Sequence, residues 1–438
     1  MYRVASPRSR IRHIVFRRVL LIPIVLLAVG ACSGKQYPSP VTPADPTTEA
    51  PETAVDPVAL EPTVIEPLPE EEESLFAGAR RVILVIGDGM GAEQIRAASL
   101  YKTGREEGLA LQSMRRYADM ATSSASHAIT DSAAAGTALA TAVKVQNGAV
   151  GVRLPGDGED IPSITEQLTE RGWRVGLVTT AHTTHATPAA FGAHVASRID
   201  YDGIARDYLT GSRPHVILGG GGYGMDRSTV MEAGYAVVTS REELSAQVRT
   251  DTTDHGIVGL FGNGHMPYIH DGRPAEMPGL VEMSERAIEF LAAEDDEFFL
   301  MIEGARIDHA GHANDIERLI PEVLELDAVV EMLLNHPELQ DGTLLVVTAD
   351  HETGGLSVVD APGARAIPRV TWSTLGHTAV DVPLFAAGVG AEGMADVIDN
   401  TLLSGAILAA LEASEDGRLA AGSTLPVAEA ATPYPHVD

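Results

Sequence analysis

The chain has 438 residues, of which 45% are hydrophobic, so it is long enough for one large α/β domain or two ordinary ones and too apolar to be disordered throughout. Its 61 acidic residues outnumber its 31 basic ones and give a net charge of −30. That charge argues against nucleic acid as a direct partner, because the phosphate backbone would be repelled. The chain has a single cysteine, which excludes an internal disulfide bond.

The N-terminal residues 1–32 have the pattern of an export signal. An arginine-rich stretch precedes an apolar run over residues 19–29, which is short for a membrane-spanning helix. Gly30, Ala31 and Cys32 follow and resemble the cleavage site of a bacterial lipoprotein. We therefore predict a lipoprotein-type signal peptide ending at Cys32, a lipid on this cysteine that anchors the mature protein to a membrane, and a periplasmic or cell-surface location. The alternative is an ordinary signal peptide with an incidental cysteine.

Two low-complexity segments flank the expected globular domain, residues 76–412. Residues 33–75 are rich in Pro, Thr, Glu and Ala. They bury too little apolar surface to offset the entropy of ordering, so we expect a disordered tether. Residues 413–438 contain small residues and proline with few large apolar side chains, and we expect a flexible tail.

Within the globular domain, short apolar runs alternate with helical segments. Continuous apolar runs of this kind suit strands that are buried on both faces. The predicted strands cover residues 82–86, 174–179, 216–218, 298–302, 344–348 and 384–387. The predicted helices cover residues 92–101, 131–142, 164–170, 280–293 and 315–334. The alternation predicts an α/β fold, a three-layer sandwich whose mostly parallel central sheet has helices on both faces.

Carboxylates and histidines follow several of the predicted strands, where functional residues of such sheets gather. Asp88 lies between two glycines, and Asp350 precedes His351 directly. Asp308 and His312 are four residues apart, so on a helical turn both can reach one ion. Taken singly, each is more often a helix cap or a surface histidine. Their common sheet edge predicts a metal site, and mixed nitrogen and oxygen ligands suit Zn²⁺.

Ser132 follows Asp131 at the start of an alanine-rich segment that favours a helix. In one interpretation, Asp131 or Ser132 is only the N-cap of that helix. In the other, the Ser132 hydroxyl lies at a helix N-terminus, where free amides and the helix dipole favour an anion such as phosphate. A serine hydroxyl is a weak nucleophile unless a base or metal activates it. Because no serine-hydrolase elbow surrounds Ser132, nearby metals would have to do so.

The chain carries several short segments in a distinctive order. They are Asp88-Gly89-Met90-Gly91, Thr130-Asp131-Ser132-Ala133-Ala134, Thr187-Pro188-Ala189-Ala190, Glu303-Gly304, Ile307-Asp308, Thr348-Ala349-Asp350-His351-Glu352 and Gly376-His377-Thr378. In this order and spacing they resemble the alkaline phosphatase family, and the resemblance covers nearly all of residues 80–411.

The resemblance implies two Zn²⁺ and one Mg²⁺ per subunit. The implied ligands are Asp308, His312 and His377 for one zinc, Asp88, Asp350 and His351 for the second, and Asp88, Thr187 and Glu303 with waters for magnesium. Magnesium prefers oxygen ligands of this kind. The resemblance further implies hydrolysis of small phosphate monoesters through a phosphoserine on Ser132. Arg198 would grip two phosphate oxygens with its planar guanidinium; a surface salt bridge is its alternative role.

Two histidines depart from some bacterial members of the family and resemble the animal-type enzymes. His185 and His309 stand where those members carry an aspartate and a lysine. We expect His185 to weaken magnesium binding at the third site, or to favour zinc or cobalt there. We expect His309 to contact phosphate through water, the alternative being a histidine merely oriented by Asp308. The resemblance also implies a homodimer. The segment between His351 and His377 is short, so the family's crown-like insertion should be small, which argues against a dimer interface built on that insertion.

Three other activities compete with a monoesterase. A phosphodiesterase of the same superfamily would normally use threonine as its nucleophile and lack the third set of ligands, so Thr187, Glu303 and Arg198 argue against it. A sulfatase needs a modifiable cysteine or serine in a motif that the chain lacks. A lipoprotein that binds phosphate or metal without catalysis would not need a serine beside the ligands.

Overall fold

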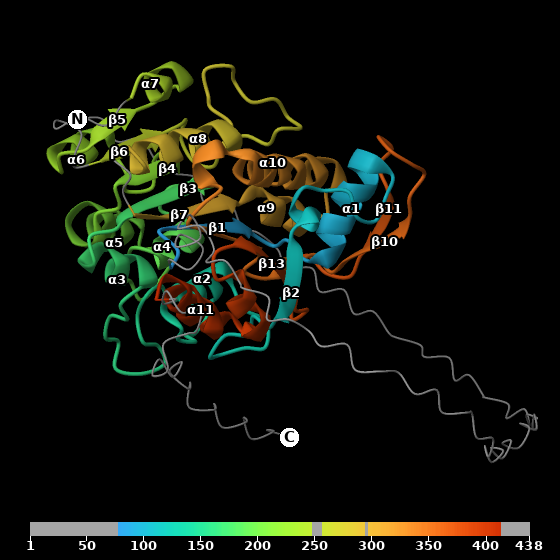
Figure 1. The fold of residues 1–438 in the computed structure, drawn as a ribbon, viewed down its shortest axis with the longest axis horizontal. Helices are drawn as coiled ribbons and strands as arrows, with labels where there is room; N and C mark the ends of the chain where they lie inside the picture. Colours follow the sequence, from blue (N-terminus) through green and yellow to red (C-terminus); the bar gives the residue numbers. More distant parts are fainter. Residues whose placement is uncertain (1–77, 248–255, 294–296, 413–438) are drawn as a thin grey trace, which may run out of the picture. The chain divides into compact units, whose positions relative to one another are not determined.

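A nine-stranded sheet is the central element of the part of the chain that the computed structural model describes, residues 78–247, 256–293 and 297–412 (Figure 1). The strand order is β2-β13-β8-β1-β7-β3-β4-β6-β5. Cys32, the expected tether and the expected C-terminal tail lie outside the described residues. Among the described helices, none has both the length and the apolarity needed to cross a bilayer.

From β8 to β5 in this order, neighbouring strands run parallel. These strands are β8 (Thr343–Thr348), β1 (Arg81–Gly87), β7 (Phe298–Gly304), β3 (Arg174–His182), β4 (Val216–Gly220), β6 (Ile257–Leu260) and β5 (Ala236–Val238). Every residue of β7 and β8 is buried, as expected for strands covered on both faces. The mostly parallel α/β sheet predicted from the sequence is confirmed.

One edge of the sheet is antiparallel. β13 (Val382–Gly388) pairs with β8, and β2 (Arg115–Met120) pairs with β13. The sequence does not predict β2, because this edge strand is polar and mostly exposed or half-buried. It also does not predict β5 and β6, which are only three and four residues long.

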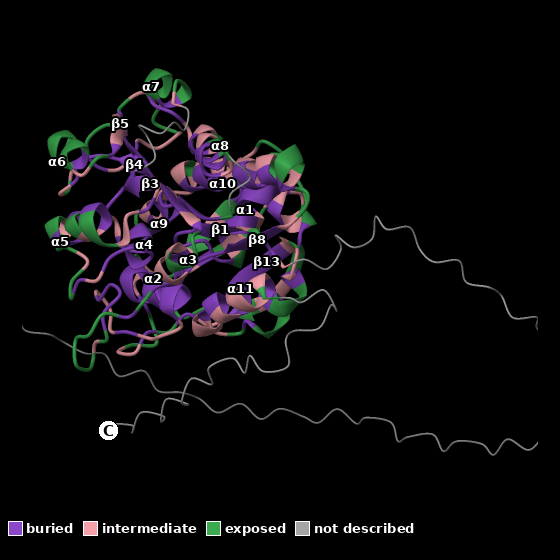
Figure 2. Cartoon of the chain, turned by 60° about the vertical axis from the view of Figure 1, so that its left-hand side comes forward, coloured by how far each residue is buried: buried purple, intermediate pink, exposed green. Residues whose placement is uncertain are grey.

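Helices cover both faces of the sheet (Figure 1). One group comprises α1 (Ala92–Thr103), α8 (Leu280–Leu291), α9 (Arg306–His312) and α10 (Ile316–Asn335). The other comprises α2 (Ser132–Thr141), α3 (Ile164–Glu170), α4 (Ala186–Ala190) and α11 (Leu403–Leu411). Figure 2 shows the buried residues concentrated in the strands and on the helix faces turned toward them. The three layers are therefore those expected from the sequence.

Shorter elements complete the fold around these layers. They are α5 (Tyr201–Arg206), the π-helical turn η3 (Asp207–Ser212), α6 (Arg227–Glu232) and α7 (Arg241–Ser245). The segment between His351 and His377 forms only two small ribbons, in which β9 pairs with β12 and β10 with β11. Their strands are β9 (Glu352–Thr353), β10 (Leu356–Asp360), β11 (Arg369–Trp372) and β12 (His377–Thr378). The insertion is small, as predicted.

Candidate metal centre and nucleophile

The predicted ligands meet at the carboxyl ends of three adjacent strands, β8, β1 and β7. The parallel register pairs Ile86 with both Glu303 and Thr348, so these strands end side by side. Asp88 follows β1 directly, and Asp350 lies two residues beyond the end of β8. Each is completely buried, as is Glu303. The fold thus concentrates carboxylates at one sheet edge, where water cannot solvate them.

A first cluster of ligand atoms joins Asp308, His377 and His351, whose candidate ligand atoms lie within 4.8 Å of one another. The Asp308 Oδ1 atom lies 3.5 Å from His377 Nε2 and 3.4 Å from His312 Nε2. Asp308 and His312 share α9, as their spacing of four residues predicts. The rings of His351 and His377 stack with centroids 3.6 Å apart.

Backbone carbonyls determine which ring nitrogen of His312 and His377 is free to bind a metal. The Nδ1 atom of His377 lies 2.8 Å from the Thr130 carbonyl, and that of His312 lies 2.6 Å from the Leu375 carbonyl. A carbonyl can only accept, so each Nδ1 donates and each Nε2 presents a lone pair. These two Nε2 atoms lie only 3.1 Å apart. The lone pairs on these two Nε2 atoms face each other and the Asp308 carboxylate, so the three groups repel one another unless a cation lies between them. The arrangement therefore fits a metal ion.

A second cluster comprises Asp88, Asp350 and His351. Asp350 Oδ1 accepts the backbone amides of Gly89 and His351, at 3.1 and 2.9 Å. Its Oδ2 has no hydrogen-bond partner and lies 3.2 Å from His351 Nε2. Both carboxylate oxygens of Asp88 are also buried without a partner. One oxygen of Asp350 is therefore fixed by the backbone while the other oxygens are free to bind a cation.

A third cluster comprises Asp88, His185 and Glu303. Thr179 donates to Glu303 Oε2, whereas Oε1 has no partner. The buried hydroxyl of Thr187 and the Nδ1 of His185 are likewise unpartnered. Magnesium prefers an all-oxygen shell, so an imidazole here fits zinc or cobalt better. Asp88 and Glu303, two of the oxygen ligands expected for the third site, thus lie together with the imidazole of His185.

The electrostatics of the three clusters also favour cations. Burial raises the pKa of Glu303 to about 7, and burial with the charge of Asp308 raises that of Asp350 to about 6. The pKa of Asp88 is raised well above its ordinary value, first by burial and then by Asp350. Burial lowers the pKa of His351, which keeps its imidazole neutral and able to bind metal. The charge, geometry and unpartnered atoms of the site all fit resident metal ions.

Thr353 contacts ligand residues of two clusters, although nothing in the sequence around it marks it as a functional residue. Its hydroxyl donates to Asp308 Oδ1 at 2.5 Å and lies 3.3 Å from His351 Nδ1. Since the hydroxyl proton is committed to Asp308, the His351 Nδ1 must donate. This leaves the His351 Nε2 lone pair for a metal. A threonine beside a strand end has no sequence signature of such a role, because the contact depends on where α9 lies.

Ser132 is the first residue of α2, and its side chain is not used as the helix cap. Asp131 is the N-cap, and its Oδ1 accepts from the Ala134 amide at 3.0 Å. The Ser132 hydroxyl lies 3.3 Å from His351 Nε2, the atom that also faces Asp350. Of the two interpretations of the sequence, the cap role falls to Asp131. The serine hydroxyl is left beside the ligand atoms at a helix N-terminus.

Arg198 lies beside this helix N-terminus. Its Nη1 donates to Asp131 Oδ2 at 3.1 Å, and its Nη2 lies 3.3 Å from His185 Nε2. The guanidinium is therefore held between the N-cap of α2 and the third cluster. A salt bridge, the alternative role for Arg198, is present, and its partner is Asp131. Because Asp131 directly precedes Ser132, this salt bridge holds Arg198 beside the serine hydroxyl.

His309 lies outside all three clusters. Its Nδ1 is 2.9 Å from Nη1 of Arg306, and its ring lies 5.7 Å from that of His185. Arginine can only donate, so the hydrogen bond to Arg306 orients this histidine. The residue that orients His309 is therefore Arg306, where the sequence suggests Asp308 as the alternative.

Comparison with known proteins agrees with this geometry. Residues 79–367 match the family model described as alkaline phosphatase. Alkaline phosphatase 4 of Bacillus subtilis (strain 168) is 36% identical over 304 residues, which are 64% of this chain and 63% of that protein. Streptomycin-6-phosphate phosphatase of Streptomyces griseus is 32% identical over 418 residues, covering 78% and 92% of the two chains. The chain thus spans less than two thirds of the Bacillus protein's length.

A solved structure shows the same likeness. The alkaline phosphatase from the Antarctic bacterium TAB5 superposes with a TM-score of 0.66 and 28% identity, covering 77% of this chain and 99% of that one. A variant of that enzyme in which a histidine is replaced by aspartate has magnesium bound in its M3 site. With the family model matching most of the chain, the protein belongs to the alkaline phosphatase family.

Proposed function

We propose that this protein hydrolyses phosphate monoesters through a covalent phosphoserine on Ser132. The observation that carries the proposal is the position of the Ser132 hydroxyl, 3.3 Å from the Nε2 atom of His351 and free of any helix-capping role. An anion placed at this helix N-terminus would meet free amides and the positive end of the helix dipole. The family membership of the chain supports the same reaction.

Two zinc ions would be held at the first two clusters, with His312 joining Asp308 and His377 of the first cluster and His351 assigned to the second. Asp308, His312 and His377 would bind one, and Asp88, Asp350 and His351 the other. When bound, such ions supply positive charge that favours the ionised serine and offsets the charge on phosphate. The protein itself contributes a fixed arrangement of ligands, because Thr130, Leu375 and Thr353 hold the three imidazoles in orientation.

Arg198 would hold the substrate phosphate. Its guanidinium presents parallel donors that match two oxygens of a phosphate. Asp131 accepts one of these donors in the substrate-free arrangement, so Arg198 is already placed beside Ser132. Ser132 would attack phosphorus, the alcohol would leave, and water would then release phosphate and restore the hydroxyl. His309 would contact the phosphate through water.

The third site would hold a metal whose identity depends on His185. Asp88, Glu303 and Thr187 suit magnesium, whereas the imidazole favours zinc or cobalt. The magnesium in the TAB5 variant supports this dependence. We expect His185→Asp to raise magnesium content at the expense of zinc, measured by elemental analysis after dialysis against both ions. Equal magnesium content in the two proteins would contradict the assignment.

Turnover of p-nitrophenyl phosphate before and after treatment with EDTA tests the proposed function. We expect activity that rises with pH, disappears on chelation and returns when zinc and magnesium are restored. Bis-p-nitrophenyl phosphate, a diester, should be hydrolysed far more slowly. Equal rates on the two substrates would favour a phosphodiesterase, and a metal-loaded protein without turnover would favour a binding protein.

We also propose that the mature protein is tethered to a membrane by lipid on Cys32. The proposal rests on the sequence around this cysteine. Globomycin, which blocks lipoprotein signal cleavage, should cause the unprocessed precursor to accumulate. An unmodified Cys32 in the mature protein would contradict the proposal. A homodimer stays a prediction that gel filtration with light scattering can test.

A further inference from the structure

Aromatic rings extend from the metal centre along the same edge of the sheet, past the ends of β3, β4 and β6. They belong to His182, His185, Tyr201, Tyr223, His265 and His309. Only His185 and His309 enter the proposed reaction. The other four rings have no role in the proposed hydrolysis, although they lie in a continuous series of contacts with His185 and His309.

Tyr223 is the outermost of these rings, and its backbone is unusual. It is the only residue with a side chain in the run of residues 219–224, which is otherwise glycine. Its φ is 52°, between Gly222 at 82° and Gly224 at 84°. This left-handed conformation is unfavourable for tyrosine and easy for glycine. A tyrosine at such a strained position points to a role for its ring.

The ring of Tyr223 is backed on one side and open to solvent. It stacks on His182 with centroids 4.1 Å apart and an interplanar angle of 17°, and it meets Tyr201 edge-on at 5.0 Å. Tyr223 is 45% exposed, whereas His182 beneath it is 2% exposed. The Thr184 hydroxyl donates to the Tyr223 carbonyl at 2.9 Å and pins the turn to the segment that carries His185. The result is a supported aromatic surface.

This surface lies next to the proposed phosphate clamp. Arg198 contacts His185 at 3.3 Å, and the ring of His185 is 5.4 Å from that of His182. Tyr201 is three residues beyond Arg198 on the chain. Two ring contacts therefore separate the guanidinium from Tyr223. A leaving group that reaches from Arg198 toward Tyr223 must carry its ring several bonds away from the phosphate, as a nucleoside 5′-phosphate does.

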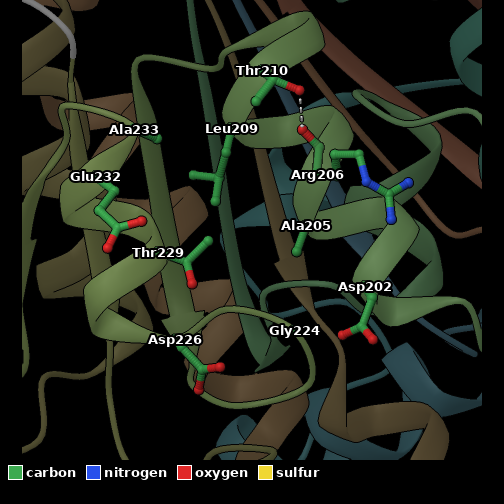
Figure 3. Close-up of a pocket in the computed structure, with 10 residues that line it drawn as sticks. All are labelled: Asp202, Ala205, Arg206, Leu209, Thr210, Gly224, Asp226, Thr229, Glu232 and Ala233. Carbon is green, nitrogen blue, oxygen red and sulfur yellow. Dashed lines mark hydrogen bonds between the residues drawn. The ribbon is translucent and has the colours of Figure 1, made fainter.

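A pocket on another side of the same turn is a poorer candidate for the leaving group. It has a volume of about 490 Å³ and lies between α5, η3 and α6, with Gly224 in its wall (Figure 3). Asp202, Asp226 and Glu232 also line it, and these three carboxylates outnumber Arg206, the one basic residue in its wall. Its carboxylates would repel a phosphorylated compound. None of its lining residues belongs to the three metal clusters.

We propose that Tyr223, supported by His182, stacks on a planar ring in the leaving group, so that the preferred substrates are monoesters of alcohols that carry an aromatic ring, such as nucleoside 5′-phosphates. The inference rests on the proposed function and deepens it. Stacking on an aromatic side chain accepts any base, because every base presents a π-face. We therefore expect substrates with an aromatic ring to be preferred over substrates without one, and we expect little discrimination between one ring and another.

Comparison of adenosine 5′-phosphate with ribose 5-phosphate tests the inference, because the two share a primary alkoxide leaving group and differ by the base. We expect the kcat/KM of the metal-loaded wild-type protein to be higher for adenosine 5′-phosphate. In Tyr223→Gly this ratio should fall by about fivefold or more, the lower limit for losing one base–aromatic stack. Glycine suits the left-handed backbone, so the variant should fold. Tyr223→Phe keeps the ring and should keep the ratio.

Met231→Ala, at an exposed apolar residue of α6, is the matched control and should leave the ratio unchanged. A wild-type ratio near one, or a ratio that survives Tyr223→Gly, would overturn the inference. So would an equal loss on both substrates in Tyr223→Gly, since that would indicate a purely structural role. If the wild-type protein hydrolyses neither compound, the proposed function itself fails.

Discussion

At the scale of single residues, the site depends on side chains that orient the ligands. Thr353 illustrates this, because one hydroxyl contacts Asp308, in the first cluster, and His351, which the first two clusters share. The contact holds His351 with Nε2 facing Asp350 and Ser132. Neither composition nor spacing reveals it. The ligands themselves are more readable from sequence, because most of them lie at or just beyond the end of a predicted strand or share a helical turn with another ligand.

Replacing Thr353 by valine should weaken metal binding while preserving the fold. Valine matches threonine in shape but cannot accept from His351 or donate to Asp308. We expect zinc affinity to fall by about 10- to 100-fold, the usual effect of losing a residue that orients a metal ligand. Competition with a chromophoric chelator measures this. Thr353→Ser keeps the hydroxyl and serves as the control, and an unchanged affinity in the valine variant would refute the role.

At the scale of elements, the site requires β1, β9 and α9 to approach closely at Gly89. This glycine has a φ of 72°, and a Cβ atom there would lie 2.8 Å from the Thr353 hydroxyl and 2.9 Å from the Asp308 backbone. The strands that bring these elements together are predictable, since their apolar runs are buried on both faces. The closeness of approach is not, because it depends on packing across the sheet edge.

Gly89→Ala should therefore lower both stability and metal content. Positive φ alone costs an alanine about 1–2 kcal/mol, and the contacts with Thr353 and Asp308 add to it. Gly172 has a φ of 89° with open space around its Cβ position, so Gly172→Ala isolates the backbone cost. We expect a lower melting temperature and less bound zinc in Gly89→Ala than in Gly172→Ala. Equal behaviour of the two variants would show that close packing at Gly89 is unimportant.

At the scale of the whole molecule, the alternation of apolar runs with helical segments makes the fold predictable. The polar residues at the carboxyl ends of the predicted strands make the location of the site predictable. The sequence does not predict the polar edge strand β2, the short strands β5 and β6, or the ring cluster around His182. β2 lacks an apolar run, and β5 and β6 are too short for a period to show. The rings come from the end of β3, from helices and from the loops that follow β4 and β6, and only the folded sheet brings them together.

The buried carboxyl groups make metal binding by the whole protein depend on pH. With the pKa of Glu303 at about 7 and that of Asp350 at about 6, the metal-free protein holds protons at pH 6 that it has lost at pH 8.5. Metal must displace those protons, so affinity should rise with pH across this interval. The buried imidazoles of His351 and His185 have lowered pKa values and contribute none.

Titration of the metal-free protein with zinc in a pH-stat counts the protons released. We expect more protons per zinc at pH 6 than at pH 8.5. The glutamine in Glu303→Gln cannot bind the proton that Glu303 carries at pH 6, so the difference in protons released per zinc between pH 6 and pH 8.5 should be smaller in this variant. Proton release that is the same at both pH values would contradict the picture of protonated carboxyl groups in the metal-free site.

The central claim is that Ser132 becomes phosphorylated during turnover. Protein mixed with a monoester, quenched in acid and digested can be examined by mass spectrometry for the peptide that contains Ser132. We predict phosphate on Ser132 in the wild-type protein. In Ser132→Ala we predict none, with unchanged metal content and a loss of kcat of about a thousandfold or more. Phosphate on another residue, or near-normal turnover by Ser132→Ala, would contradict the assignment of Ser132 as the nucleophile.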